Sequence, residues 1–178
     1  MKETPQEYTR RILGYVEGQD ALKIQRRTAN ALARLIKGVA PSTLRQRPAP
    51  GKWSVIEILA HLADAEIVGS WRIRAILGAP GTALQPFDQD AWAAALHYDR
   101  LDPRRSLELF RVLRDMNLAL FKTITPGQWR QHGVHAERGV ESVEHIVRLY
   151  AGHDLNHRRQ IERIVAAKRR RPRPRPRR

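Results

Sequence analysis

Residues 143–167 read VEHIVRLYAGHDLNHRRQIERIVAA, and this stretch decides the fold because it predicts a long amphipathic helix with histidines on its apolar face. His153 and His157 lie on the line that joins Tyr150 to Ile161, where the pattern predicts core residues. Their spacing puts both imidazoles on one helix face, one turn apart. The apolar residues of the stretch recur at helical spacing: Val143, Ile146, Val147, Tyr150, Ile161 and Ile164.

A third histidine occupies the apolar face of another predicted helix, over residues 54–77. His61 shares its stripe with Ile58, Ala65 and Val68. Three histidines on inward helix faces are costly to bury unless something binds them. A divalent metal ion is the simplest partner, because neutral imidazole is the commonest metal ligand. Three protein ligands, with a coordination position left to water or substrate, are typical of a catalytic zinc-type site.

The alternative for any one of these histidines is a core side chain that only makes a hydrogen bond, and spacing alone leaves both interpretations open. The His-x-x-x-His spacing is common by chance, and Asp154 stands where the His-Glu-x-x-His motif has its glutamate. We assign no metal to the other histidines. These are His97, His132, His135 and His145, and we expect His132 and His135 to face solvent in a glycine-flanked loop.

Four long amphipathic helices account for most of the chain. Capping residues, prolines and glycines place them at about residues 20–37, 54–77, 102–124 and 142–167, and a short first helix follows Thr4. The connection between 78 and 102 carries a short helical segment around Trp92, and residues 125–141 read as a loop. No segment shows convincing period-2 alternation. The pattern predicts an all-α four-helix bundle with long connecting loops.

Several residues interrupt the helical pattern and have specific expectations. Gly69 and Gly152 lie inside predicted helices, which indicates that a neighbouring element approaches closely there. Asn117 interrupts an apolar stripe, so we expect it to hydrogen-bond in the core or to line a pocket. Asp64 can reach the same face as His61. Glu57 completes a capping box with Ser54, and we prefer this role to one beside a metal.

The composition is that of one globular domain. The chain has 178 residues, 42% of them hydrophobic, and no cysteine, which excludes disulfides and thiolate metal sites. The charged N-terminus has no apolar region for secretion, and no apolar run has membrane-spanning length. We therefore expect a cytoplasmic protein with no membrane span.

The basic charge is concentrated at the C-terminal end. Residues 168–178 read KRRRPRPRPRR, and without them the formal charge of +15 falls by about half. We predict a bundle over 1–167 and a disordered Arg/Pro-rich tail over 168–178. The tail could bind nucleic acid electrostatically, but we favour a solvated, extended end with no specific partner. The body carries no helix-turn-helix, zinc-finger or aromatic RNA-binding signature.

Three segments together resemble the DinB/YfiT-like superfamily. The first is Gly51-Lys52-Trp53-Ser54 followed by the sequence AHLADAE at 60–66, and the second is LYAGHDLNHRRQI at 149–161. The sequence PFDQDAWA at 86–93 resembles the YfiT-like branch in particular. The resemblance covers roughly residues 20–165, and the arginine-rich tail lies outside the family pattern.

The resemblance implies a metal-binding four-helix bundle with ligands at His61, His153 and His157, the same three residues that the helical pattern indicates. It implies a divalent ion such as zinc or nickel, and a homodimer. Some members resemble S-transferases that use bacillithiol or mycothiol, and others are described as metal-dependent hydrolases. The name implies no DNA chemistry.

We therefore predict an enzyme that joins a low-molecular-weight thiol to a small electrophile, held against Trp53, Trp92 or Tyr150. The metal would favour the thiolate at neutral pH. The first alternative is a hydrolase that activates water, although no residue stands out as its general base. The second alternative is a non-catalytic nucleic-acid-associated protein that uses the tail.

Overall fold

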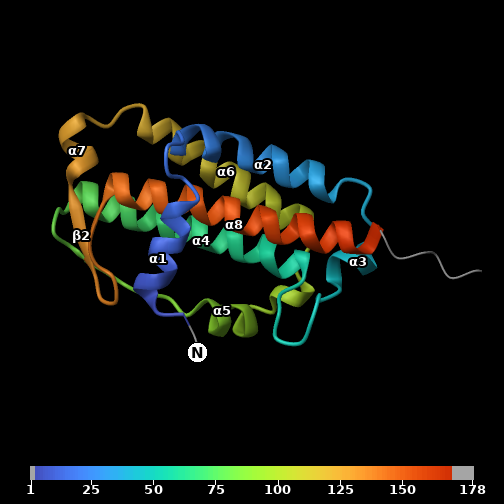
Figure 1. Cartoon of the computed structure of the whole chain (residues 1–178). Helices are drawn as coiled ribbons and strands as arrows, with labels where there is room; N and C mark the ends of the chain where they lie inside the picture. The colour runs from blue at the N-terminus through green and yellow to red at the C-terminus, as the bar shows by residue number, and fades with distance from the viewer. Residues whose placement is uncertain (1–2, 170–178) are drawn as a thin grey trace, which may run out of the picture.

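The computed structural model describes residues 3–169 and consists mainly of a four-helix bundle, as the sequence predicts. The long helices α2 (Ala21–Ile36), α4 (Val55–Gly78), α6 (Pro103–Phe121) and α8 (Val143–Arg169) run side by side (Figure 1). α8 packs against both α2 and α4, and α4 also packs against α6. The faces of α4 and α8 that carry the predicted ligands are therefore in direct contact.

Helix starts follow their capping residues. Ser54 and Glu57 form the expected capping box at the start of α4, and Thr4 does the same with Glu7 at α1 (Pro5–Gly14). Asp102 accepts hydrogen bonds from the first turn of α6, where Pro103 is the first helical residue. The predicted helix boundaries agree with the structure to within about three residues.

Short elements fill the connections. The turn-rich region before α4 contains a one-turn helix, α3 (Pro41–Arg45), and the connection between α4 and α6 contains α5 (Gln89–Ala95) and the 3-10 helix η1 (Tyr98–Arg100). α1 packs across α8 on the outside of the bundle (Figure 1). α5 and η1 pack on α4, α1 packs on α8, and α3 lies near the start of α4 (Figure 1).

The expected loop over residues 125–141 is wrong in its detail. It contains the short helix α7 (Pro126–Arg130) and a hairpin of β2 (His132–His135) with β3 (Gly139–Ser142). β1 (Ala83–Leu84) pairs in parallel with β2, so a small three-stranded sheet lies at one end of the bundle (Figure 1). Strands of two to four residues are too short to show alternation, which is why the sequence gives no strand signal.

Two glycines allow the close approaches that the sequence predicts. A Cβ on Gly69 would lie 2.5 Å from the ring of Tyr150, so α4 accepts that ring against its backbone. A Cβ on Gly152 would lie 2.2 Å from the carbonyl oxygen of Ile12, so α1 rests directly on α8. Both contacts are beside the predicted metal ligands.

The core of the described chain has three apolar clusters, and a polar layer lies between the two larger ones; the smallest consists of Val16, Ala151 and Leu155. One of the larger clusters gathers around Phe110 and Ile161, and the other around Phe121 and Ile146. Between them lies Arg114, which is 2% exposed and forms ion pairs with Glu66 and Asp154. Asn117 also donates to Glu66 at 2.7 Å, as expected for a polar residue in an apolar stripe.

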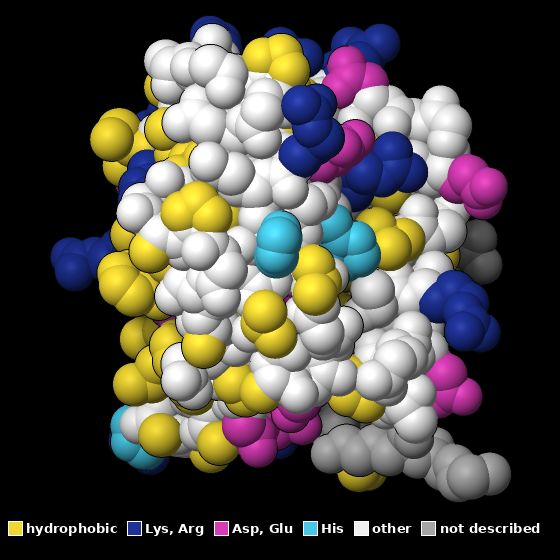
Figure 2. Space-filling model, turned by 90° about the vertical axis from the view of Figure 1, so that its left-hand side faces the viewer, with side chains coloured by type: hydrophobic (Ala, Val, Ile, Leu, Met, Phe, Trp, Pro, Cys, Tyr) yellow, Lys and Arg dark blue, Asp and Glu magenta, His cyan; other side chains and the backbone are white. Residues whose placement is uncertain are grey.

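No helix within residues 3–169 combines the length and the apolar character needed to cross a bilayer. Figure 2 faces the end of the bundle with β2 and α7, and it shows hydrophobic side chains gathered toward one edge of this face. α8 continues to Arg169, and the rest of the predicted tail lies outside the described residues.

Candidate metal centre

Three imidazoles from two helices converge on one point in the middle of the bundle. His61 comes from the second turn of α4, and His153 and His157 come from successive turns of α8. The Nε2 atom of His153 lies 2.9 Å from Nε2 of His61 and 3.0 Å from Nε2 of His157. His61 and His157 are buried, and His153 is partly exposed. The structure thus brings together the three histidines that the sequence singles out.

All three rings are held in the neutral form that binds metals. Burial is the largest cause: it holds the pKa of His61 and of His153 well below 6.5, and the neighbouring ring of His157 adds to the effect. The pKa of His157 falls to about 4 because burial outweighs its hydrogen bond with Gln160. Neutral imidazoles present lone pairs rather than charge, which suits a cation between them.

The protonation of the rings is also consistent with a metal. His157 Nδ1 lies 2.8 Å from Oε1 of Gln160, an acceptor, so the proton belongs on Nδ1 and the Nε2 lone pair faces His153. His153 Nε2 has a histidine nitrogen on two sides and cannot donate a single proton to both. Lone pairs that converge in this way repel one another unless a cation lies between them.

The dimensions fit a divalent ion after small movements. Three nitrogens about 2.0–2.1 Å from a tetrahedral zinc ion are about 3.3–3.4 Å apart. The two Nε2 distances from His153 are a few tenths of an ångström shorter than this, and the three ligand nitrogens together lie within 4.8 Å of one another, so the rings must shift to give all three pairs the zinc spacing. Within residues 3–169, this is the one cluster of three or more histidine, cysteine, aspartate or glutamate side chains that could hold a metal ion.

Aromatic side chains surround the cluster. The ring of Trp53 lies 4.8 Å from that of His61, and the ring of Tyr150 lies 6.1 Å from that of His153. Trp92 reaches the cluster only through Phe87, whose ring lies 5.0 Å from Trp92 and 6.5 Å from His61. The sequence analysis did not select Phe87, although it belongs to the YfiT-like segment at 86–93.

Nearby carboxylates have other partners. Glu57 caps α4 and also pairs with Arg47, which supports its predicted structural role. Asp154 is not placed as a catalytic base, because Arg114 holds both of its oxygens. Asp64 follows His61 by three residues and accepts a hydrogen bond of 2.5 Å from the hydroxyl of Tyr98. Asp64 is therefore the carboxylate near the cluster that carries no ion pair among the described residues.

The expectation that His135 faces solvent is wrong. His132 is exposed, but His135 is 1% exposed, because alternate residues of β2 point inward beneath β1. Burial, with a smaller contribution from the guanidinium groups of Arg138 and Arg72, lowers the pKa of His135 to about 4. Neither histidine belongs to the three-histidine cluster.

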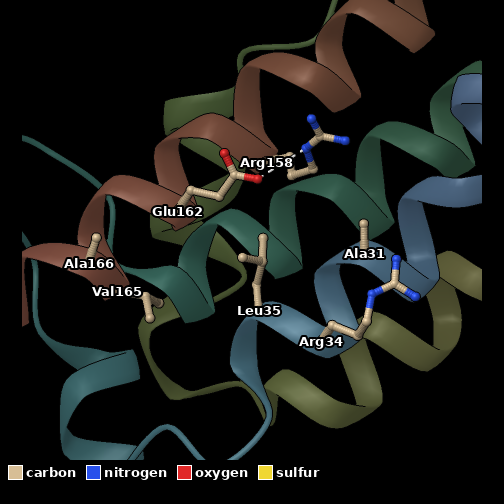
Figure 3. Close-up of a pocket in the computed structure, with 7 residues that line it drawn as sticks. All are labelled: Ala31, Arg34, Leu35, Arg158, Glu162, Val165 and Ala166. Atoms are coloured by element: carbon tan, nitrogen blue, oxygen red, sulfur yellow. Dashed lines mark ion pairs between the residues drawn. The ribbon is translucent and has the colours of Figure 1, made fainter. Parts of the chain in front are cut away.

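A separate hollow on the surface does not include the histidines. A cavity of about 460 Å³ lies between α2 and α8 (Figure 3), where Arg34 and Leu35 face Arg158 and Glu162 across it. None of the three histidines and none of the aromatic residues around them lines this cavity. We place the candidate site at the histidines, because three converging neutral imidazoles can coordinate a metal ion and the residues that line the hollow include no such group of ligands.

The fold and the cluster together define a class: four-helix bundles with a three-histidine site between two helices. A family model described as the DinB superfamily matches residues 25–161, so the chain belongs to the DinB superfamily. This agrees with the resemblance found in the sequence.

Named relatives support the same grouping. "Putative metal-dependent hydrolase YfiT" from Bacillus subtilis (strain 168) is 29% identical over 129 residues, which cover 70% of this chain and 72% of the relative. A further "Putative metal-dependent hydrolase" from Oceanobacillus iheyensis is 25% identical over 118 residues, or 66% of this chain and 68% of the relative.

A solved structure has the same fold. It is described as "YfiT from Bacillus subtilis is a probable metal-dependent hydrolase with an unusual four-helix bundle topology", and it superposes with a TM-score of 0.79 at 23% identity. The match covers 83% of this chain and 85% of that one. At this identity the likeness establishes the fold.

Proposed function

We propose that this protein binds one divalent metal ion through His61, His153 and His157 and transfers a low-molecular-weight thiol to a small electrophile. Support for the ion comes from three neutral imidazoles whose nitrogens converge within 4.8 Å of one another. Zinc and nickel both suit an imidazole ligand set. Three protein ligands leave at least one position for an exchangeable group, as in catalytic sites.

The observation that carries thiol transfer is an all-imidazole cluster lined by aromatic rings, with no carboxylate in the ligand set among residues 3–169. A divalent ion here supplies Lewis acidity, which lowers the pKa of a thiol or of a water molecule. Thiolate formation at such an ion would release the thiol proton to solvent, so this chemistry would not require a separate protein base. The chain has no cysteine that would compete for the electrophile or the ion.

The residues around the cluster have roles in this proposal. Trp53 and Tyr150 would hold the electrophile against the imidazoles, since their rings contact His61 and His153. Trp92 would contribute indirectly, by packing against Phe87. Gln160 positions His157 by accepting the hydrogen bond from Nδ1.

The second candidate is a metal-dependent hydrolase, which two observations favour. The relatives described above carry that name. Asp64 is the nearby carboxylate without an ion pair among the described residues, and Tyr98 orients it by hydrogen bonding. Asp64 would then accept a proton from the attacking water.

We also propose a homodimer formed through the outer faces of α4 and α6. Ile67 and Trp71 on α4 are 42% and 67% exposed, and Met116 on α6 is 60% exposed. Asn117 donates to Ser70 at 2.6 Å, which shows that this side of α6 adjoins α4. Leu109 and Val112 on α6 are also exposed, so several large apolar side chains lie on the outer sides of these two helices, and contiguous exposed apolar patches can mark interaction sites.

The test combines metal analysis with a substrate screen. Purified protein should contain about one divalent ion per chain, which the double variant His153→Ala/His157→Ala should lose. The matched control is His132→Ala/His145→Ala, which removes two histidines outside the cluster and should keep the ion. Thiol-dependent turnover lost with the ion supports the proposal. Turnover of ester or amide substrates without thiol, with full metal dependence, would replace it with the hydrolase.

A further inference from the structure

Arg72 is a buried cation on α4 that has no carboxylate in ion-pair contact among residues 3–169. It is 4% exposed. Its Nη2 donates to the carbonyl oxygen of Gln85 at 2.5 Å and lies 3.2 Å from Nε2 of His135. Its Nε is buried without a hydrogen-bond partner in the described chain. The hydroxyl of Tyr150 also forms a hydrogen bond with this guanidinium and favours its charged form. A guanidinium stays charged in a protein, so Arg72 is a buried charge with polar neighbours but no ion-paired carboxylate among residues 3–169.

The carboxylate that favours the charged form of Arg72 does not form an ion pair with it. Glu141 favours the charged form of Arg72 from a distance, but its two oxygens accept hydrogen bonds from Arg138 at 2.6 and 2.9 Å. Arg114 offers the contrast within the same bundle, because it is equally buried and binds two carboxylates. Buried charges are normally paired. The missing partner of Arg72 is therefore an anion.

His135 cannot fully satisfy Arg72 either. Its Nδ1 accepts the backbone N–H of Glu137 at 3.2 Å, and its Nε2 faces Arg72. A neutral imidazole has only one acceptor nitrogen. One of these two donors therefore faces an N–H group, and a stronger acceptor would relieve the conflict.

Arg72 is connected to the three-histidine cluster by one aromatic ring. Tyr150 lies over Gly69, one turn before Arg72 on α4, and its ring is 6.1 Å from that of His153. The segment 85–87 also runs from Arg72 to the three-histidine cluster. The carbonyl oxygen of Gln85 accepts a hydrogen bond from Arg72, and the ring of Phe87 lies 6.5 Å from that of His61. His61 and Arg72 are about 16 Å apart along the helix axis, and the long arginine side chain leans back toward the helix start.

We propose that Arg72 binds the carboxylate of a small molecule whose reacting group lies at the three-histidine cluster. The placement of the reacting group at the histidines depends on the proposed function, whereas the anion site at Arg72 does not. The carboxylate replaces the Gln85 carbonyl as the acceptor, and it also receives the free Nε–H. Gln85 and Pro86 are exposed, so this segment can move without breaking the core. The carboxylate can belong to the thiol or to the electrophile.

The first experiment needs neither metal nor turnover. Metal-free, ¹⁵N-labelled full-length protein is titrated with malonate and followed by NMR at the Arg72 Nε–H signal, with chloride at equal ionic strength and uncharged malonamide as comparisons. We expect a saturable shift with malonate alone, lost in Arg72→Met and kept in Arg163→Met, an exposed arginine on α8. No saturable shift in the wild-type protein would overturn the proposal, and this result does not depend on any variant folding.

The second experiment identifies which substrate carries the carboxylate. The metal-loaded protein is assayed with cysteine against cysteamine, and with electrophiles that have or lack a carboxylate. Arg72→Met should lower kcat/KM about tenfold or more for the carboxylated partner and leave its neutral analogue unchanged, as expected for a lost charged hydrogen bond. Equal losses for both members of each pair would reduce Arg72 to a structural role and refute the proposal. A malonate shift without any thiol turnover would keep the anion site and reject thiol transfer.

Discussion

Gly152→Ala should destabilise the protein although alanine is the better helix residue. In an unobstructed helix interior the substitution stabilises by about 1 kcal/mol. Here the new Cβ would lie 2.2 Å from the backbone oxygen of Ile12 and 2.9 Å from its carbonyl carbon. Backbone atoms cannot rotate away as a side chain can, so α1 must move off α8 by about 1 Å.

The size of the effect follows from what α1 and the turn after it bury. Ile12 and Val16 are both 0% exposed, and fully burying an aliphatic side chain is worth about 1.5–3 kcal/mol. Partial loss of both outweighs the helix-propensity gain and gives a net loss of about 2–4 kcal/mol. For a domain of this size, that lowers Tm by about 4–16 °C.

The assay is urea and thermal unfolding of Gly152→Ala beside Gly14→Ala. Gly14 lies at the end of α1, and a Cβ there would meet no atom within 4 Å, so its substitution should be neutral or mildly stabilising. If Gly152→Ala were as stable as Gly14→Ala, the close packing of α1 on α8 would be refuted. Metal affinity should fall with stability, because His153 is the next residue.

Three further predictions follow. Truncation after Ala167 should change Tm by less than about 2 °C, because the basic residues 168–178 are not expected to pack on the bundle; a large drop would move the predicted domain boundary. The pKa of His135 is about 4 in the folded protein and near 6.5 when unfolded, so below pH 6.5 the unfolded chain binds the proton first and stability falls by up to about 3 kcal/mol by pH 4. Unfolding free energy measured against pH should therefore fall more steeply for wild type than for His135→Gln, and parallel curves would contradict the assignment. Trp71→Glu, on the exposed apolar face, should yield monomers in light scattering where wild type gives dimers; a wild-type monomer would remove the proposed interface.

The helical part of the fold could be predicted because its signals are local. The capping box of Ser54 and Glu57 lies within one turn of the helix that it starts. The convergence of His61 with His153 follows from two separate helix faces, each readable from a spacing of 3.6 residues. Only the pairing of α4 with α8 needed the bundle architecture, and four long amphipathic helices allow few alternatives.

The missed features depend on partners that are distant in sequence. β2 acquires its inward and outward sides only by pairing with β1, about fifty residues earlier, so the burial of His135 has no local signal. Arg114 and Arg72 both look like surface arginines in an amphipathic helix. Each is buried because segments from elsewhere close over it. Only the structure shows that Arg114 has carboxylate partners and that Arg72 has no ion-paired carboxylate within residues 3–169.

The buried ion pairs explain how the candidate site keeps its shape before any ion binds. Arg114 on α6 holds Glu66 on α4 and Asp154 on α8, so it ties together the two helices that supply the histidines. Asp154 directly follows His153, and Glu66 lies little more than one turn after His61. Breaking this network would leave carboxylates buried without a partner, at a cost of about 3–5 kcal/mol. The three imidazoles are therefore held close together against their mutual repulsion by a charge network that does not touch the ligand position, and this organisation favours rapid capture of a cation over refolding around it.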